Sequence, residues 1–151
     1  MPRSAQDQTL LLLARAVMGI STRAADRLGE LSVVQLRAMT VLRELGTANL
    51  GQLAEGLDVT VSTTSRLVDR LVAAGLAERR PAPHTRREIR LSLTRVGKGT
   101  LARYDRLRLD RLHSCLDHLP GGQHEPLLAA LRTLVEAVPD VRESPPPASV
   151  G

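Results

Sequence analysis

Four side chains that can bind metals lie close together near position 118. They are His113, Cys115, His118 and His124, and a thiolate with imidazoles is a plausible ligand set for zinc. On a helix, His113 and His118 would point roughly 140 degrees apart, whereas metal ligands on one helix usually have a spacing of three or four residues. Only Cys115 and His118 have that spacing. We therefore expect no metal and no cofactor, and keep a metal-responsive protein as an alternative.

Catalytic groups are not apparent in the sequence. An enzyme needs a nucleophile with a base, paired carboxylates in a cleft, or a glycine-rich phosphate loop. Cys115 with His118 would be a poor dyad, and no nucleotide-binding glycine fingerprint occurs. The neighbours of Cys115 do not clearly favour a thiolate, so a small packed hydrophobe is its simpler role. We predict that the chain is not an enzyme.

Positive charge is concentrated in one segment. Residues 60–98 contain nine cations and three anions, a net charge of +6, while the rest of the chain has a net charge of −1. A basic block suits a polyanion, because arginine contacts with phosphates release counterions. Nucleic acid is the leading candidate. The alternative is a solvated face in a chain that uses Arg in place of Lys, with 20 Arg and 1 Lys.

Composition sets further bounds. The 151 residues suit one domain, and the core must consist of Leu, Val and Ala because Tyr104 is the only aromatic residue. Aromatic platforms for base stacking are therefore excluded, and with them most single-strand binders. The single cysteine allows no internal disulfide, and the longest apolar run, Leu10–Ala14, is far too short to span a bilayer. With no export segment apparent, we expect a cytoplasmic protein.

Capping signals and apolar spacing predict four helices in the first half of the chain. The first covers residues 5–27, and its apolar stripe is wide enough to contact both its own core and a second subunit. Capping boxes at Ser32 and Asn49 begin the next two helices, which stop near Gly46 and Gly56. The fourth starts after Thr60 and ends at Gly75.

The third and fourth helices form a helix-turn-helix pattern, two short helices with a tight turn between them. The beginning of the fourth helix is positioned to enter a major groove. Its side chains are small hydroxyls and one arginine that can reach guanine or a phosphate, namely Val61, Ser62, Thr63, Ser65 and Arg66. Ser62 and Thr63 have a simpler role at the helix N-terminus, which is itself an anion site.

A β-hairpin with a basic tip follows. Residues 76–80 and 88–93 alternate in polarity, whereas Pro81 and Pro83 argue against regular structure over residues 81–87. Ile89, Leu91 and Leu93 share one face of the second strand. Arginines on the projecting tip can enter a minor groove or contact the adjacent phosphates.

The C-terminal part reads as two more helices. Thr94 caps a long helix that continues to Pro120, and the last helix covers residues 123–138. With the first helix they indicate a dimerisation bundle. We predict a mainly α fold with a small β-hairpin wing, divided into a dimerisation helix (1–30), a winged helix-turn-helix region (31–98), dimerisation helices (99–138) and a disordered tail (139–151).

The chain resembles the MarR family of winged-helix transcriptional regulators over about residues 5 to 138. The similarity is strongest in residues 67–80 and 88–97, which look like the family's recognition-helix end, wing strands and start of helix five. It implies a triangular dimer on DNA, with Arg87 as the wing arginine that enters the minor groove. The family wing often reads Asp-x-Arg, and Thr85 stands at the Asp position. Thr85 or His84 would then orient Arg87, or Arg86 would replace it.

The hypothesis is therefore a homodimeric regulator of double-stranded DNA, most simply a repressor that binds a pseudo-palindromic operator. The predicted DNA-binding residues are Asn49, Thr60, Val61, Ser62, Thr63, Ser65, Arg66, Arg70, Arg86 and Arg87. The resemblance also implies a small anionic or phenolic effector, for which the candidate pocket residues are Leu11, Arg15, Met18, Met39 and Arg43. A winged-helix module that binds protein is the alternative.

Overall fold

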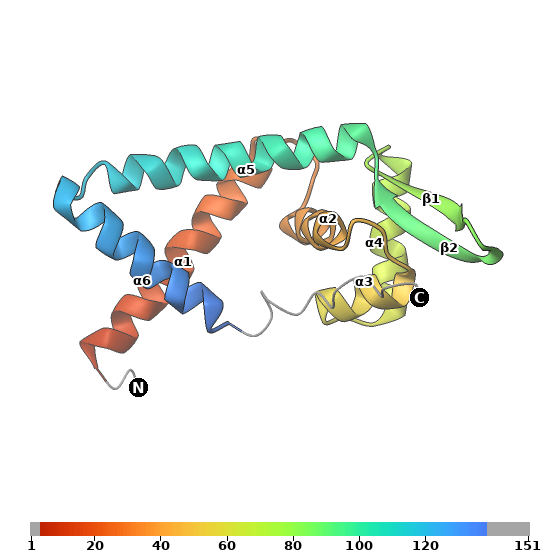
Figure 1. The fold of residues 1–151 in the computed structure, drawn as a ribbon. Helices are drawn as coiled ribbons and strands as arrows, with labels where there is room; N and C mark the ends of the chain where they lie inside the picture. Colours follow the sequence, from red (N-terminus) through yellow and green to blue (C-terminus); the bar gives the residue numbers. More distant parts are fainter. Residues whose placement is uncertain (1–3, 139–151) are drawn as a thin grey trace.

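The structure is a computed structural model that describes residues 4–138 (Figure 1). Within this range the chain is mainly helical with one two-stranded hairpin, which confirms the predicted fold class. The elements, in order, are α1 (Ala5–Asp26), α2 (Val33–Leu45), α3 (Leu50–Leu57), α4 (Val61–Ala73), β1 (Ala77–Ala82), β2 (Thr85–Leu93), α5 (Arg95–Leu116), the 3-10 turn η1 (Gly121–Gln123) and α6 (His124–Glu136). The predicted tail, 139–151, lies outside the described residues. Among the described helices, none is long and apolar enough to cross a membrane.

The predicted caps set the helix starts. Ser32 and Asn49 each form a complete capping box, with Gln35 and Gln52 respectively, and the hydroxyl of Thr94 accepts a hydrogen bond from the backbone N–H of Gly97 at the start of α5. These bonds satisfy donors that a helix N-terminus leaves unpaired. Helix α3 ends one residue later than predicted, at Leu57, because Asp58 adopts a left-handed conformation.

The core lies where α2, α3, α4, the hairpin and the first half of α5 meet. It consists almost entirely of aliphatic side chains, and its largest fully buried members include Leu36, Met39, Leu42, Leu53, Leu71, Leu91 and Leu101. Ala48 in the α2–α3 connection exchanges two backbone hydrogen bonds with Leu91 of β2, at 3.0 and 2.7 Å. These bonds fix the hairpin against the helix-turn-helix.

The hairpin differs from the prediction, because its strands extend through most of residues 81–87. Strand β1 continues through Pro81 to Ala82, and β2 starts at Thr85. A two-stranded sheet has only edge strands, where proline is tolerated. The register then shifts: Pro81 pairs with Ile89 but Ala82 pairs with Thr85, so residues 86–88 bulge out of the ladder. Leu91 and Leu93 are buried as predicted, whereas Ile89 is 44% exposed.

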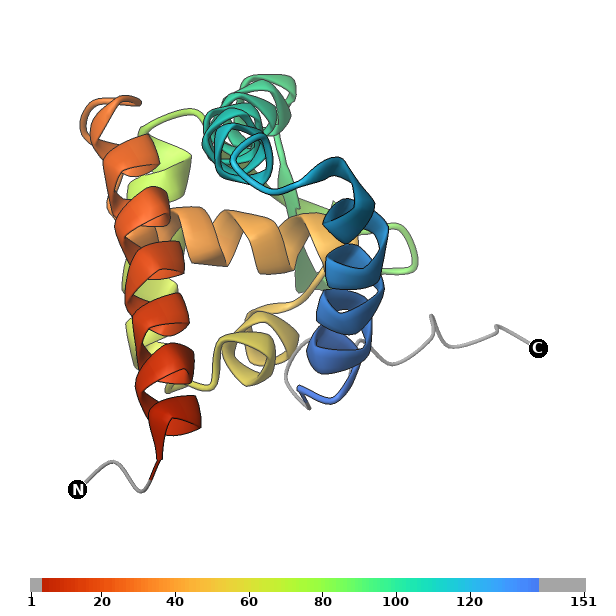
Figure 2. The same cartoon turned by 90° about the vertical axis from the view of Figure 1, so that its left-hand side faces the viewer.

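Helices α1, α5 and α6 extend away from this core as an arm. Helix α5 runs from the wing to the far end of the molecule (Figure 1), and in the turned view α1 and α6 stand on opposite flanks (Figure 2). Of α1, only Ala24 and Ala25 are buried, and α6 has no buried residue. The arm therefore exposes large apolar side chains, namely Leu10, Leu11, Leu12, Leu13, Val17, Met18, Leu109, Leu112, Leu128, Leu134 and Val135.

Candidate nucleic-acid interface

The first turns of α4 present one polar face to solvent. Thr64, Leu67, Val68 and Leu71 are buried, and the hydroxyl of Thr64 donates to the carbonyl of Thr60 at 3.0 Å. This buried stripe turns the intervening residues outward. Val61, Ser62, Thr63 and Arg66 are accordingly exposed, and Ser65 is half-buried. The fold thus places these five predicted residues together on an accessible helix start.

Two other predicted residues also serve as helix caps. The hydroxyl of Thr60 accepts from the backbone N–H of Thr63 at 3.2 Å and donates to the hydroxyl oxygen of Thr63 at 3.0 Å. The side-chain oxygen of Asn49 accepts from the backbone N–H of Gln52 at 2.8 Å. Both side chains therefore position the two helices whether or not they also contact a ligand.

Ion pairs divide the cations of the basic segment into two groups. All three acids of residues 60–98 are paired: Asp69 with Arg79 at 2.5 Å, Glu78 with Arg80 at 3.0 Å and Glu88 with Arg90 at 3.1 Å. The other six cations make no ion pair within residues 4–138, and they are Arg66, Arg70, Arg86, Arg87, Arg95 and Lys98. The whole excess charge of the segment is thus available to an external anion.

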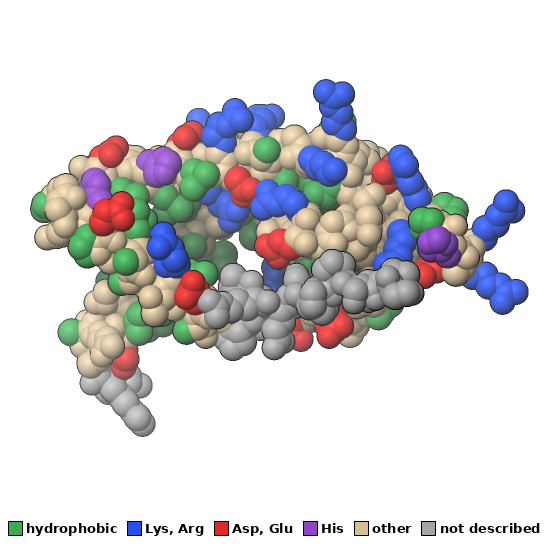
Figure 3. Space-filling view, in the orientation of Figure 1, with side chains coloured by type: hydrophobic (Ala, Val, Ile, Leu, Met, Phe, Trp, Pro, Cys, Tyr) green, Lys and Arg blue, Asp and Glu red, His purple; other side chains and the backbone are tan. Residues whose placement is uncertain are grey.

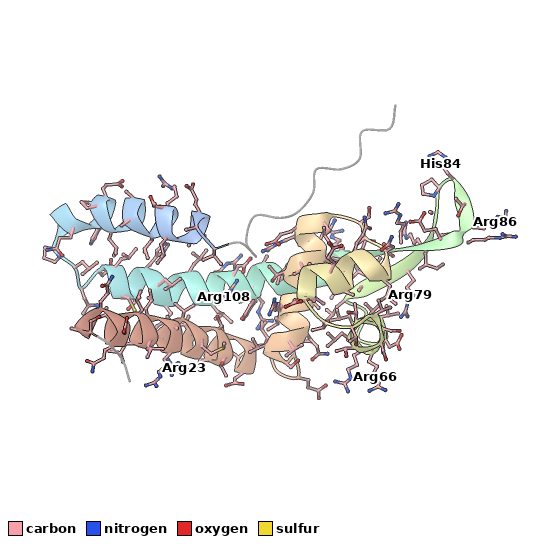
Figure 4. All side chains as sticks on the ribbon, turned by 90° about the horizontal axis from the view of Figure 1, so that it is seen from below. Arg23, Arg66, Arg79, His84, Arg86 and Arg108 are labelled. Carbon is pink, nitrogen blue, oxygen red and sulfur yellow. The ribbon has the colours of Figure 1, made fainter. Side chains whose placement is uncertain are left out.

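The unpaired cations are carried by α4, the wing and the start of α5. The four predicted arginines, Arg66, Arg70, Arg86 and Arg87, all belong to this group and all are exposed. Arg86 projects from the wing tip and Arg66 from α4 (Figure 4), and Lys and Arg side chains protrude at the wing end of the molecule (Figure 3). Sequence reasoning did not single out Arg95 and Lys98, although both stand in the same basic block.

Thr85 holds the bulge that carries the wing arginines. Its hydroxyl oxygen accepts from the backbone N–H of Glu88 at 3.2 Å, which closes a local turn around Arg86 and Arg87. Within the described residues, neither Thr85 nor His84 bonds to the guanidinium of Arg87. Thr85 therefore stabilises the backbone turn that carries the two arginines. The Asp expected at this position from the family resemblance would instead orient the arginine side chain.

The predicted effector residues do not line one cavity. Leu11, Arg15 and Met18 border a shallow hollow on α1, whereas Met39 is fully buried in the core and Arg43 is ion-paired with Asp105 of α5 at 2.6 Å. Met39 is buried because α2 is surrounded by other elements and contacts α1, α3, α4, α5 and β2.

A separate crevice of about 490 Å³ lies between α1, α2 and α5. Met18 is the only predicted residue on its wall, which also includes Arg37, Thr40, Tyr104 and Arg108. The sequence does not indicate these four residues, because α2 and α5 meet only in the tertiary structure. The ion-paired residues Arg43 and Asp105, for example, are 62 positions apart in the sequence. Arg37 is a cation in this wall without an ion pair among the described residues.

Asp105 joins the lobe to the arm. It accepts hydrogen bonds from Arg43 of α2 and from Arg108 one turn along α5, and the Arg108 guanidinium lies 4.2 Å from the centre of the Tyr104 ring. Burial acts to raise the pKa of Asp105, but the bonds and positive charges of Arg43 and Arg108 outweigh it and lower the pKa below its ordinary value of 3.8.

Two of the histidines considered as metal ligands, His118 and His124, have local partners. The Nδ1 atom of His118 lies 2.7 Å from the carbonyl oxygen of Ser114, and Nε2 of His124 lies 3.2 Å from that of Leu119. Across residues 4–138, no three His, Cys, Asp or Glu side chains come together as a metal site.

Comparisons with known proteins agree with this geometry. Residues 31–89 match the model of the MarR family, while curated protein sequences gave no match. The structure is similar to RV1404 from Mycobacterium tuberculosis, with 29% identity over 91% of this chain and 96% of that chain and a TM-score of 0.80.

Two further similar structures show the same fold at lower identity. One is a MarR family protein from Bacillus stearothermophilus, with 22% identity, coverage of 87% and 91%, and a TM-score of 0.79. The other is a mutant of MepR from S. aureus bound to an oligodeoxyribonucleotide, with 15% identity, coverage of 89% and 98%, and a TM-score of 0.69.

Proposed function

We propose that this winged helix-turn-helix protein, whose residues 31–89 match the MarR family, is a cytoplasmic transcriptional repressor of that family that binds a pseudo-palindromic DNA operator as a homodimer. Helix α4 enters the major groove, where Arg66 and the hydroxyl residues beside it contact base edges and phosphates. Arg86 and Arg87 on the wing reach the adjacent minor groove and its phosphates.

The observation that supports DNA as the ligand is the pairing of charges. Every acid in residues 60–98 is neutralised by an arginine of the same segment, so the unpaired cations have no internal partner there. Four of them, Arg66, Arg70, Arg86 and Arg87, lie on an exposed helix and a projecting hairpin, which are the two elements that fit DNA grooves. A neutral protein surface would provide no counter-charge for these unpaired cations.

The exposed apolar side chains of the arm support the proposed homodimer. Soluble proteins rarely expose a contiguous apolar patch of this kind without a partner, and α1, α5 and α6 expose large aliphatic side chains along most of their length. A second copy with the same three helices is self-complementary in a two-fold interface. A dimer with this symmetry would present two α4 helices to one duplex.

The crevice between α1, α2 and α5 is the site we propose for a small anionic or phenolic effector. Tyr104 and Met18 supply apolar wall, and Arg37, which makes no ion pair within residues 4–138, supplies positive charge. Because the crevice lies between the lobe and the arm, an occupant that prefers one spacing of the two lobes changes DNA affinity.

The test of DNA binding is selection of bound duplexes from a random pool at two salt concentrations. An inverted repeat with half-sites about one helical turn apart is expected. Arg66→Ala should lose discrimination at particular base pairs, while Arg80→Ala, which removes a cation already paired with Glu78, should keep it. If no sequence is enriched and binding disappears at moderate salt, the protein-binding alternative replaces the repressor.

The dimer is tested separately by sedimentation equilibrium. Leu12, which is 63% exposed, is replaced by Glu, and Val34→Glu on α2 is the control, since Val34 is a similarly exposed residue outside the arm. We expect Leu12→Glu to sediment as a monomer and Val34→Glu as a dimer. A monomeric wild type would contradict the proposed assembly.

A further inference from the structure

One large apolar side chain stands among the residues that begin α4. Val61 is the first residue of this helix and is 52% exposed, although valine is ordinarily a core residue. It is not a member of the core cluster, to which α4 contributes Leu67, Val68 and Leu71. A single exposed valine is common on protein surfaces and needs no explanation by itself. The position of Val61 within the candidate interface is what indicates a role.

Val61 stands at the tip of the accessible side of α4. Residues four apart lie on the same side of a helix, so Val61 lies one turn before Ser65, and Ser62 lies one turn before Arg66. Arg66 projects from the helix into solvent (Figure 4). A major groove that receives the first turns of α4 therefore meets Val61 together with these polar side chains.

The chemistry of Val61 suits one base in a major groove. Its side chain has no hydrogen-bond donor or acceptor, and thymine is the base that presents a methyl group there. Beside the amino group of adenine or cytosine, valine would exclude water without replacing its hydrogen bond. Against the thymine methyl group it buries two apolar surfaces instead. A hydroxyl such as that of Ser62 can bond to donors and acceptors alike, so it discriminates less.

We propose that Val61 is a specificity-determining residue that contacts a thymine methyl group in each half-site of the operator. This role rests on the proposed function, because it requires α4 to lie in the major groove. Arg66, five residues further along α4, is suited to contact guanine. Five residues of helix rise by roughly 7.5 Å, which is about two base-pair steps. When α4 follows the groove, the thymine should lie within about three base pairs of that guanine.

The experiment removes the methyl group from the DNA and leaves the protein unchanged. Each thymine of the duplex selected from the random pool is replaced in turn by uracil, which has the same hydrogen-bonding groups but no methyl group. The change is made symmetrically in both half-sites, and fluorescence anisotropy gives the affinity of the full chain for each duplex. At one position of the half-site we expect uracil to lower affinity about fourfold for each methyl group removed, or about 15-fold for both.

The variant Val61→Ala tests whether this preference comes from Val61. Alanine lacks the two methyl groups of valine and is a better helix former, and circular dichroism verifies that the variant is folded. The matched control is Val96→Ala, since Val96 is 64% exposed in the first turn of α5. It lies near the opposite end of α4, because the hydroxyl of Thr94 donates to the carbonyl oxygen of Gly75 at 2.6 Å.

The thymine preference should distinguish the two variants. We expect it to fall below about twofold per half-site in Val61→Ala and to remain about fourfold in Val96→Ala. The expected thymine lies within about three base pairs of a guanine whose replacement weakens binding by the wild type but not by Arg66→Ala.

The outcomes separate the role of Val61 from the proposed function. If an inverted repeat is enriched but uracil has no effect at any position, the role of Val61 is overturned while sequence-specific DNA binding stands. The same holds if Val61→Ala keeps the thymine preference of the wild type. If no sequence is enriched from the pool, both are overturned.

Discussion

The wing arginines provide a quantitative prediction about the salt dependence of DNA binding. Replacing Arg86 and Arg87 by Gln removes two unpaired cations from each protomer, and therefore four from a dimer. If all four contact phosphates, the slope of log affinity against log salt should become shallower by about 3.6, at about 0.9 per contact. Between 50 and 200 mM salt, the wild type should then lose about 100-fold more affinity than the variant.

The control is Arg79→Gln with Arg80→Gln. It changes the net charge by the same amount in the same hairpin, but it removes cations that are already paired, with Asp69 and Glu78. Fluorescence anisotropy with the selected duplex, measured at several salt concentrations, gives both slopes. We expect the control slope to remain near that of the wild type. Equal slopes for the two variants would refute the reasoning, because affinity would then follow net charge and not the unpaired side chains.

Three further predictions concern the junctions that support the site. Asp105→Asn should lower the free energy of unfolding by about 1–2 kcal/mol at neutral pH, since two partly exposed charged hydrogen bonds are weakened. Because the folded-state pKa of Asp105 lies below the ordinary value of 3.8, this contribution is fully present well above 3.8 and is lost as pH falls below 3.8 and through the folded-state pKa, so urea denaturation near pH 3 should show a smaller difference than at pH 7. Gly97→Ala should cost about 2–3 kcal/mol or more, because its Cβ would lie 2.0 Å from the carbonyl oxygen of Leu76; Gly99→Ala, with open space around it, should instead stabilise α5 in the same thermal melts. Thr85→Val should weaken DNA binding about fivefold through loss of the turn bond to Glu88, while Thr85→Ser should not; equal binding by both would show that this bond does not matter.

The sequence predicted those parts of the fold that depend on short-range signals. Capping residues such as Ser32, Asn49 and Thr60 determine helix starts through bonds to residues three positions away, so their pattern is visible in the chain. The hairpin is less predictable from the sequence, because a proline such as Pro81 ordinarily indicates the end of a strand. Its tolerance depends on the sheet having only two strands, which is a property of the tertiary structure.

The candidate site likewise has features that the sequence predicts and features that depend on the tertiary structure. The exposed arginines of α4 and the wing were predicted from charge and spacing, but which cations remain unpaired became known only from the ion pairs. The effector residues were least predictable. Met39 has the same apolar character as an exposed pocket residue, and only the packing of the lobe shows that it is fully buried.

Tyr104 gives the protein a built-in optical reporter. The chain has no Trp and no Phe, so this ring is its only aromatic chromophore. It is 3% exposed, lies under the Arg108 guanidinium and borders the crevice between lobe and arm. The near-ultraviolet circular dichroism and the tyrosine emission of the protein therefore report on the surroundings of Tyr104 alone. A change in the position of the lobe relative to the arm alters these surroundings and should change both signals. Rearrangement of that junction is observable in the unmodified protein, without an attached dye.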